Sequence, residues 1–168
     1  MRTVVIGLGN PLMGDDGVGL VALERLTREW ALDGVELVDG GTWGMSLLPV
    51  IEDAERLVFV DAITAGGAPG DLVVLERGAL PIYFTRKLSP HQTDLRDVLA
   101  AAEWRGTLPS ETVAIGVHPQ VVALGTELTP AVAESVEGLI GAVVGQLRRW
   151  GHECRPWYEP VPAAACTR

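Results

Sequence analysis

The sequence predicts an α/β fold, a three-layer α/β/α arrangement around a mostly parallel, twisted and doubly wound sheet. Continuous apolar runs rich in β-branched residues, such as residues 3–8 and 57–60, are typical of strands buried on both faces of a parallel sheet. These runs alternate with segments whose apolar residues recur at helical spacing, which is the pattern of βαβ units. A chain of 168 residues with 48% hydrophobic content is about right for one domain, which we place at residues 1–151.

The N-terminal half predicts three strands and two helices. Residues 3–8 form the first, central strand, which ends at Gly9, and residues 35–38 and 57–60 form the next two strands. A helix is expected over residues 16–30, because five apolar residues recur there at helical spacing. These residues are Val18, Val21, Ala22, Leu26 and Trp30. A short helix should follow the second strand, and its apolar face should contain Met45, Leu48 and Ile51.

The next segment predicts two further strands with a helix between them. Residues 72–75 follow a cluster of turn residues after a short connection, which favours an antiparallel neighbour over a helical crossover. Ser89 as N-cap and Pro90 at the first helical position indicate the start of the helix. Residues 112–117 then form the last strand.

The clearest helix is expected over residues 130–150. Thr129 is its N-cap, Pro130 begins it, and Gly151 ends it. Its apolar stripe consists of Val132, Val136, Leu139, Ile140, Val143 and Leu147. Residues 152–168 contain three prolines and no periodicity, which predicts an irregular tail or an extended strap over the surface.

Composition limits the partners and the compartment. The formal net charge is −9 and the pI is about 4.7, without a basic block that could follow a phosphate backbone, so we expect no nucleic-acid partner. The apolar run near the N-terminus is too short for a signal peptide or a membrane span, which favours the cytoplasm and no membrane partner. Cys154 and Cys166 form no metal-binding motif and are expected to be reduced, idle thiols.

Four polar clusters fall where predicted strands end or the next helix begins: Asp15 with Asp16, Asp39, Asp61 and His91. In a doubly wound sheet, ligands collect outside the carboxyl ends of the strands. Two carboxylates and one imidazole form a mixed oxygen and nitrogen set that suits nickel or zinc and leaves positions open for substrate. The sequence therefore indicates a site for metal-assisted hydrolysis at this edge.

A purely structural role is the alternative for each of these residues. Asp15 or Asp16 would then cap the helix that follows, and Asp61 would accept hydrogen bonds from backbone amides at the end of its strand. Asp39, before two glycines, would be a turn residue, and His91 an ordinary polar residue. We therefore base the metal hypothesis on the set and not on any one member.

The glycines of residues 7–19 also suggest a dinucleotide-binding loop, with Asp39 as the ribose-binding acid. Two features argue against it. Leu12 occupies the position of the third glycine, and Asp15 and Asp16 bring negative charge to a place where a pyrophosphate needs amide donors.

Four strings taken together resemble the [NiFe]-hydrogenase maturation endopeptidases. They are GLGNPLMGDDGVG at 7–19, DGGTWG at 39–44, VDA at 60–62 and LSPHQTDLRDVL at 88–99. The resemblance implies a five-stranded twisted sheet between helices, of the phosphorylase/hydrolase-like kind. It also implies a protease that removes the C-terminal extension of a hydrogenase large-subunit precursor after nickel insertion.

The same resemblance assigns roles to residues. The metal ligands and catalytic residues would be Asp16, Asp61 and His91, and the substrate-binding segment would be Asp39, Gly40, Gly41 and Thr42. Nickel would arrive already bound to the precursor, and other divalent metals would substitute for it in vitro. Cleavage would then depend on correct metal insertion, because the enzyme's three ligands are incomplete without the ion of the substrate.

Two alternatives stay open at this point. Gly7 to Pro11 also resembles the start of bacterial peptidyl-tRNA hydrolases, although the acidic charge of the chain opposes binding of RNA. A non-catalytic, nickel-dependent escort of the precursor would use the same three ligands. The nucleophile is not identified, His118 is expected to be structural, and we expect a monomer.

Overall fold

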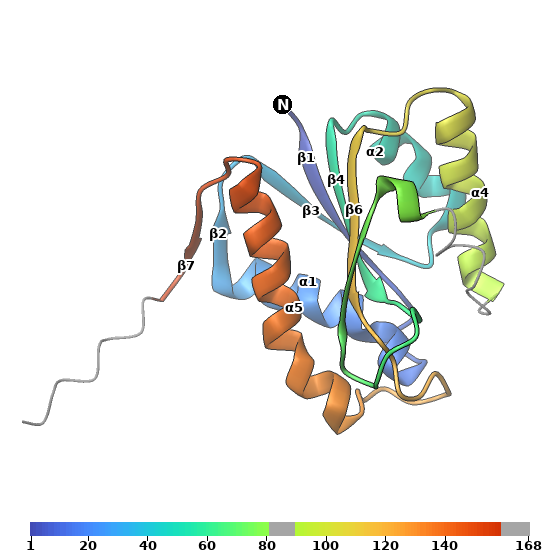
Figure 1. Ribbon diagram of the computed structural model, residues 1–168, viewed down its shortest axis with the longest axis vertical. Coiled ribbons are helices and arrows are strands. Elements are labelled where there is room, and N and C mark those ends of the chain that lie inside the picture. Colours follow the sequence, from blue (N-terminus) through green and yellow to red (C-terminus); the bar gives the residue numbers. More distant parts are fainter. Residues whose placement is uncertain (81–89, 159–168) are drawn as a thin grey trace, which may run out of the picture.

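The protein folds around one five-stranded sheet in the order β3-β1-β4-β6-β5 (Figure 1). The structure is a computed structural model that describes residues 1–80 and 90–158, with the backbone alone for residues 90–96. The strands are β1 (Thr3–Leu8), β3 (Val35–Gly41), β4 (Arg56–Ala62), β5 (Leu72–Glu76) and β6 (Glu111–Val117). β5 runs antiparallel to β6, while the other four strands are parallel. Both the mostly parallel sheet and the antiparallel β5 confirm the prediction.

Helices cover both faces of the sheet, which gives the predicted three layers (Figure 1). The α-helices are α1 (Val18–Glu29), α2 (Leu48–Glu52), α4 (Pro90–Trp104) and α5 (Pro130–Arg149). Three short 3₁₀ helices are η1 (Gly14–Gly17), η2 (Gly44–Leu47) and η3 (Arg77–Ala79). α1 and α5 pack on one face of the sheet, and α2 and α4 pack on the other. The predicted N-cap of α4, Ser89, lies outside the described residues.

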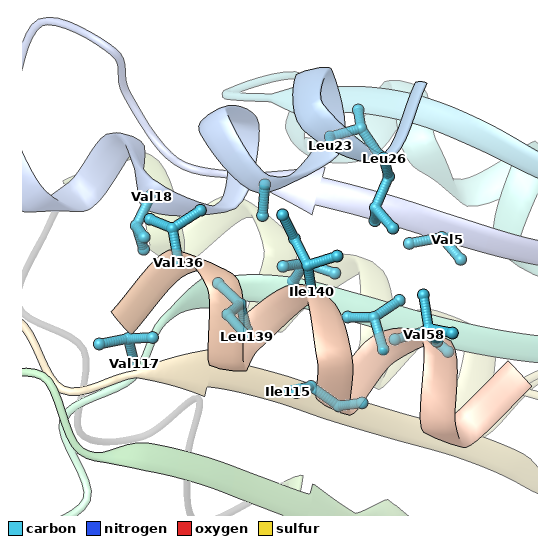
Figure 2. Close-up of a cluster of buried hydrophobic side chains, with 14 of the residues drawn as sticks. Val5, Val18, Leu23, Leu26, Val58, Ile115, Val117, Val136, Leu139 and Ile140 are labelled. Carbon is cyan, nitrogen blue, oxygen red and sulfur yellow. The ribbon is translucent and has the colours of Figure 1, made fainter. Parts of the chain in front are cut away.

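Alternation along the buried strands divides the core into two clusters. Val5 of β1 and Val58 of β4 point toward α1 and α5, as Figure 2 shows. Ile6 and Phe59, the next residues on the same strands, point toward α2 and α4. Both faces of these strands are therefore apolar, which explains why their sequences are continuous hydrophobic runs and do not alternate.

The direction of strand succession reverses between β1 and β4. The chain moves from β1 to β3 through α1, and then returns through α2 to β4 on the other side of β1. α1 and α2 lie on opposite faces of the sheet. This reversal is the switch point of the sheet, and open α/β sheets bind their ligands outside the carboxyl ends of the strands at such a point.

The C-terminal segment contains a strand that the sequence did not predict. Cys154–Pro156 form β7, which pairs antiparallel with β2 (Trp30–Leu32). Of the two alternatives predicted for residues 152–168, β7 contradicts the irregular tail and agrees with an extended strap, while residues 159–168 lie outside the described residues. The predicted first helix ends at Glu29 instead of Trp30. The guanidinium of Arg148 lies 5.6 Å from the centroid of the Trp30 ring and donates a 2.7 Å hydrogen bond to the carbonyl of Cys154.

The short helix after β3 begins with a 3₁₀ turn, which changes its buried face. Met45, predicted to be buried, is 52% exposed, whereas Leu47 and Ile51 are buried. The cause is the tighter period of a 3₁₀ turn, about three residues per turn, which shifts the phase of the side chains. In the part of the chain that the structure describes, no helix combines the length and apolar character needed to cross a membrane.

Candidate active site

The loop between β1 and η1 folds back tightly on itself. Gly9 has a φ of +121°, and a Cβ at this position would lie 1.8 Å from the carbonyl oxygen of Asp16, so only glycine fits. The fold of the loop lets the backbone N–H of Asn10 donate a 2.9 Å hydrogen bond to Oδ2 of Asp16. Asp16 is 4% exposed, so the loop holds its carboxylate at the buried end of β1.

The neighbouring acid, Asp15, binds a different part of the protein. Its side chain is fully buried and accepts hydrogen bonds from the backbone N–H groups of Gln120, Val121 and Thr129, at 2.9, 2.9 and 2.7 Å. The hydroxyl of Thr129 also donates to the carboxylate, at 2.9 Å from Oδ2. Burial by itself would raise the pKa of Asp15, but these hydrogen bonds together lower it below its ordinary value.

The capping roles expected from the sequence differ from those observed. Gly17 is the N-cap residue of α1, so neither Asp15 nor Asp16 occupies that position. Thr129 is the N-cap of α5 as predicted, but its hydroxyl makes no capping bond and donates to Asp15 instead.

Asp61 lies near the carboxyl end of β4 and is 2% exposed. By strand alternation it faces the same side as Leu57 and Phe59, the side that α4 covers. Oδ1 of Asp61 accepts a 2.7 Å hydrogen bond from the backbone N–H of Ala62. Opposite Asp61 on β6 stands Gly116, where a Cβ would lie 2.2 Å from the carbonyl oxygen of Asp61.

The close approach of α1 to the sheet brings the elements that carry the two acids into contact. Gly19 of α1 faces the carbonyl oxygens of Val60 and Leu8, which would lie 2.2 and 2.4 Å from a Cβ at this position. η1, which carries Asp16, therefore contacts β4, which carries Asp61. Asp16 and Asp61 thus belong to neighbouring elements at the carboxyl edge of the sheet, the edge at which the sequence predicts a site.

His91 is the second residue of α4, but its side chain is outside the described residues. Figure 1 shows the N-terminal end of α4, in yellow-green, at the same end of the sheet as the arrowheads of the parallel strands. The helix covers the face toward which Asp61 points. The described side chains include no group of three or more His, Cys, Asp or Glu residues able to hold a metal ion.

The segment Asp39 to Thr42 leaves β3 beside the loop of Asp16. Gly40 is buried, and a Cβ there would lie 2.5 Å from Cγ2 of Ile6. The carbonyl of Gly41 accepts a 3.2 Å hydrogen bond from the N–H of Gly9, which joins the two loops. Asp39 and Thr42 are exposed, so the segment presents polar side chains to solvent beside the loop that follows β1.

Two features of this edge were not predicted. Large apolar side chains are exposed on the segments that follow β1, β3 and β6, including the start of η2. They are Leu12, Trp43, Met45, Val121, Val122 and Leu124. A signal for the third segment was present, because Val121 to Leu124 is an apolar run inside a predicted loop. The anchoring role of Asp15 had no local signal, since its partners lie 105 to 114 residues away.

His118 follows β6 at the same edge. Its N–H donates to the carbonyl of Asp71 and its carbonyl accepts from the N–H of Gly70, both at 2.9 Å. Its Nδ1 is buried and has no hydrogen-bond partner among the described residues.

Known proteins resemble this chain in sequence and in structure. A family model described as hydrogenase maturation protease matches residues 21–146. A hydrogenase expression/formation protein of Rhodobacter capsulatus, HupD, is 41% identical over 155 residues, which are 90% of this chain and 74% of the relative. The hydrogenase 2 maturation protease of Escherichia coli K12 is 38% identical over 158 residues, 93% of this chain and 96% of the relative.

Solved structures show the same likeness. The E. coli hydrogenase maturating endopeptidase HybD superposes with a TM-score of 0.88 at 37% identity, covering 94% of this chain and 98% of that chain. The [NiFe] hydrogenase maturation protease HybD of Thermococcus kodakarensis gives a TM-score of 0.69 at 27% identity, covering 86% and 98%. These likenesses decide against the peptidyl-tRNA hydrolase alternative. The chain belongs to the hydrogenase maturation proteases, a family of endopeptidases.

Proposed function

We propose that this endopeptidase removes the C-terminal extension of a [NiFe]-hydrogenase large-subunit precursor after nickel has been inserted. Its family and the names of its relatives support the reaction and the substrate class. The observation that carries the proposal is the contact between η1, which contains Asp16, and β4, which contains Asp61 near its carboxyl end, with the N-terminus of α4 at the same end of the sheet. We further propose that the protein acts in the cytoplasm as a monomer.

The nickel of the precursor would be recognised by Asp16, Asp61 and His91. Two carboxylates and an imidazole are a donor set that suits nickel. Both carboxylates are buried, and each accepts a hydrogen bond from a backbone N–H that fixes its orientation. Metal ligands in proteins are commonly oriented by such hydrogen bonds from neighbouring groups. In this proposal nickel is part of the substrate, and other divalent metals would replace it in vitro.

The side chains of the enzyme would orient the precursor and accept the proton that the attacking group releases. Bound nickel would polarise the scissile carbonyl or a water molecule. Asp16 or Asp61 would accept the proton from the attacking group, since both belong to elements that meet at the carboxyl edge of the sheet. The exposed Asp39 and Thr42, on the bend made by Gly40 and Gly41, would contact the chain of the precursor.

The test is cleavage of a nickel-loaded precursor, followed by the mass of the large subunit. Asp16→Ala, Asp61→Ala and His91→Ala are expected to fold but to leave the precursor uncut. Asp53→Ala is the control, because Asp53 is an exposed acid at the amino end of β4. Retained cleavage in one of the three variants would remove that residue from the proposed site.

Two further outcomes would contradict the proposal. Equal cleavage of nickel-loaded and nickel-free precursor would show that the enzyme does not recognise the nickel bound to the precursor. Binding of the precursor without loss of a peptide would support the escort alternative instead of proteolysis.

A further inference from the structure

Two adjacent acids, Asp15 and Asp16, send their carboxylates to different partners. We propose that Asp15 is a positioning residue for the cleavage reaction, because it fixes the loop that carries Asp16. This inference rests on the proposed role of Asp16 in cleavage of the precursor.

The carboxylate of Asp15 joins the η1 turn to the loop between β6 and α5. It receives three backbone N–H groups and one hydroxyl, all from Gln120, Val121 and Thr129. One of these residues, Thr129, is the N-cap of α5, a helix of 20 residues. Since α5 contributes eight buried residues along its length, Asp15 attaches the turn to a firmly packed element.

Backbone hydrogen bonds join the same two loops. The N–H of Asp15 donates to the carbonyl of Val121 at 3.1 Å, so Asp15 and Val121 are bonded in both directions. The N–H of Gly14 donates to the carbonyl of Gly125, and the N–H of Gly125 donates to the carbonyl of Leu12. The segment that precedes Asp16 is therefore held from Leu12 to Asp15 by the β6–α5 loop.

The chemistry of these contacts requires a carboxylate at position 15. All the groups that face it are donors, and an ionised carboxylate is an acceptor with about four lone-pair sites. An asparagine has nearly the same shape but replaces one oxygen with an NH₂ group. That NH₂ group would face N–H or O–H donors in either orientation, so the contact would open and the turn would move.

A movement at Asp15 reaches Asp16 directly, because a single peptide bond separates them. Catalytic groups must be held to a fraction of an ångström, and a shift of about 1 Å is enough to lower a rate by up to about 100-fold. Asp15 would thus control the rate of cleavage without contacting the precursor or its metal.

The experiment measures single-turnover cleavage of nickel-loaded precursor as a function of enzyme concentration. Asp15→Asn is expected to lower the rate at saturating enzyme by about tenfold or more, with little change in the half-saturating concentration. Thr129→Val, which removes the hydroxyl donor, should lower the saturating rate less, and Thr129→Ser, which restores the donor, should return it toward the wild-type value.

Val143→Ala is the control for general destabilisation. Val143 is buried on α5 about 20 Å along the helix from Pro130, and its truncation leaves the Asp15 contacts intact. At a temperature where circular dichroism shows every variant folded, this control should cleave at the wild-type rate. A folded Asp15→Asn variant with wild-type saturating rate, or an equal loss in Val143→Ala, would overturn the inference.

The outcomes also separate this inference from the proposed function. If Asp16→Ala cleaves normally, the proposed function fails. If Asp16→Ala is inactive while folded Asp15→Asn is fully active, only the positioning role fails. If Asp15→Asn does not fold, equal saturating rates for Thr129→Val and Thr129→Ser would still overturn the inference.

Discussion

Replacing Gly19 with alanine should destabilise the protein, whereas the same replacement at Gly141 should stabilise it. Both glycines lie in α-helices, α1 and α5. A Cβ on Gly19 would meet two backbone carbonyl oxygens at 2.2 and 2.4 Å, while a Cβ on Gly141 would have no neighbour within 4 Å. Both variants add the same methyl group to a helix, and they differ in whether that group meets backbone atoms.

The magnitudes follow from two opposing effects. Alanine gains up to about 1 kcal/mol over glycine inside a helix. Overpacking costs about 1–3 kcal/mol, and we take the upper end for Gly19, because both opposing atoms belong to the backbone of buried strands and cannot rotate away. The net change is a loss of about 2 kcal/mol for Gly19→Ala and a gain of about 0.5–1 kcal/mol for Gly141→Ala.

Denaturant unfolding gives these free energies, and thermal unfolding checks them. At about 2–4 °C per kcal/mol, Tm should fall by about 4–8 °C for Gly19→Ala and rise by about 1–4 °C for Gly141→Ala. Because η1 leads directly into α1, the displaced helix should also slow cleavage of the precursor. A Gly19→Ala protein as stable as wild type would refute the close-packing argument for this position.

Three further predictions concern folding and titration. Val136→Asp should prevent stable folding, because it places an unpaired charge among the buried side chains of Figure 2; circular dichroism of the purified variant would show native structure if this reasoning were wrong. The pKa of Asp15 is lower in the folded state, so its contribution to stability is complete above the ordinary pKa of 3.8 and is lost as the pH falls through the folded pKa. The free energy of unfolding of Asp15→Asn should therefore depend less on pH in this acidic range than that of the wild type. The same pH dependence in both proteins would contradict the prediction. Cys154 is buried, and burial raises the pKa of its thiol. In a Cys166→Ser variant, a thiol reagent should therefore modify Cys154 only after denaturation. Rapid labelling of the native protein would contradict the burial of Cys154.

The sheet and the long helix were predictable because their signals are local. β1, β4 and β6 are buried on both faces and read as unbroken apolar runs, and α5 shows a regular stripe with a proline at its start. The errors occur where distant pairing decides the structure. Trp30 continues the helical spacing of α1, yet it pairs with Pro156 of β7, which lies near the other end of the chain.

The position of the acids at the sheet edge was predictable for the same topological reason. Asp16 comes after the buried strand β1 and Asp61 lies near the end of β4, and the carboxyl ends of such parallel strands lie at one edge. The division of roles between Asp15 and Asp16 was not predictable, because the two adjacent acids differ only in the direction of their side chains. That direction depends on Gln120, Val121 and Thr129, which no local pattern links to the first loop.

The glycines of the first loop explain why a dinucleotide-like sequence leads to a different site. Gly9 and Gly19 serve close packing, against the backbone of Asp16 and against the carbonyls of Leu8 and Val60. In dinucleotide-binding loops, backbone amides after the first strand receive the pyrophosphate. Here the amide of Asn10 is used by the carboxylate of Asp16, so the loop supplies its own anion. The strand, loop and helix arrangement that elsewhere holds a phosphate thus holds a fixed carboxylate at the switch point of the sheet.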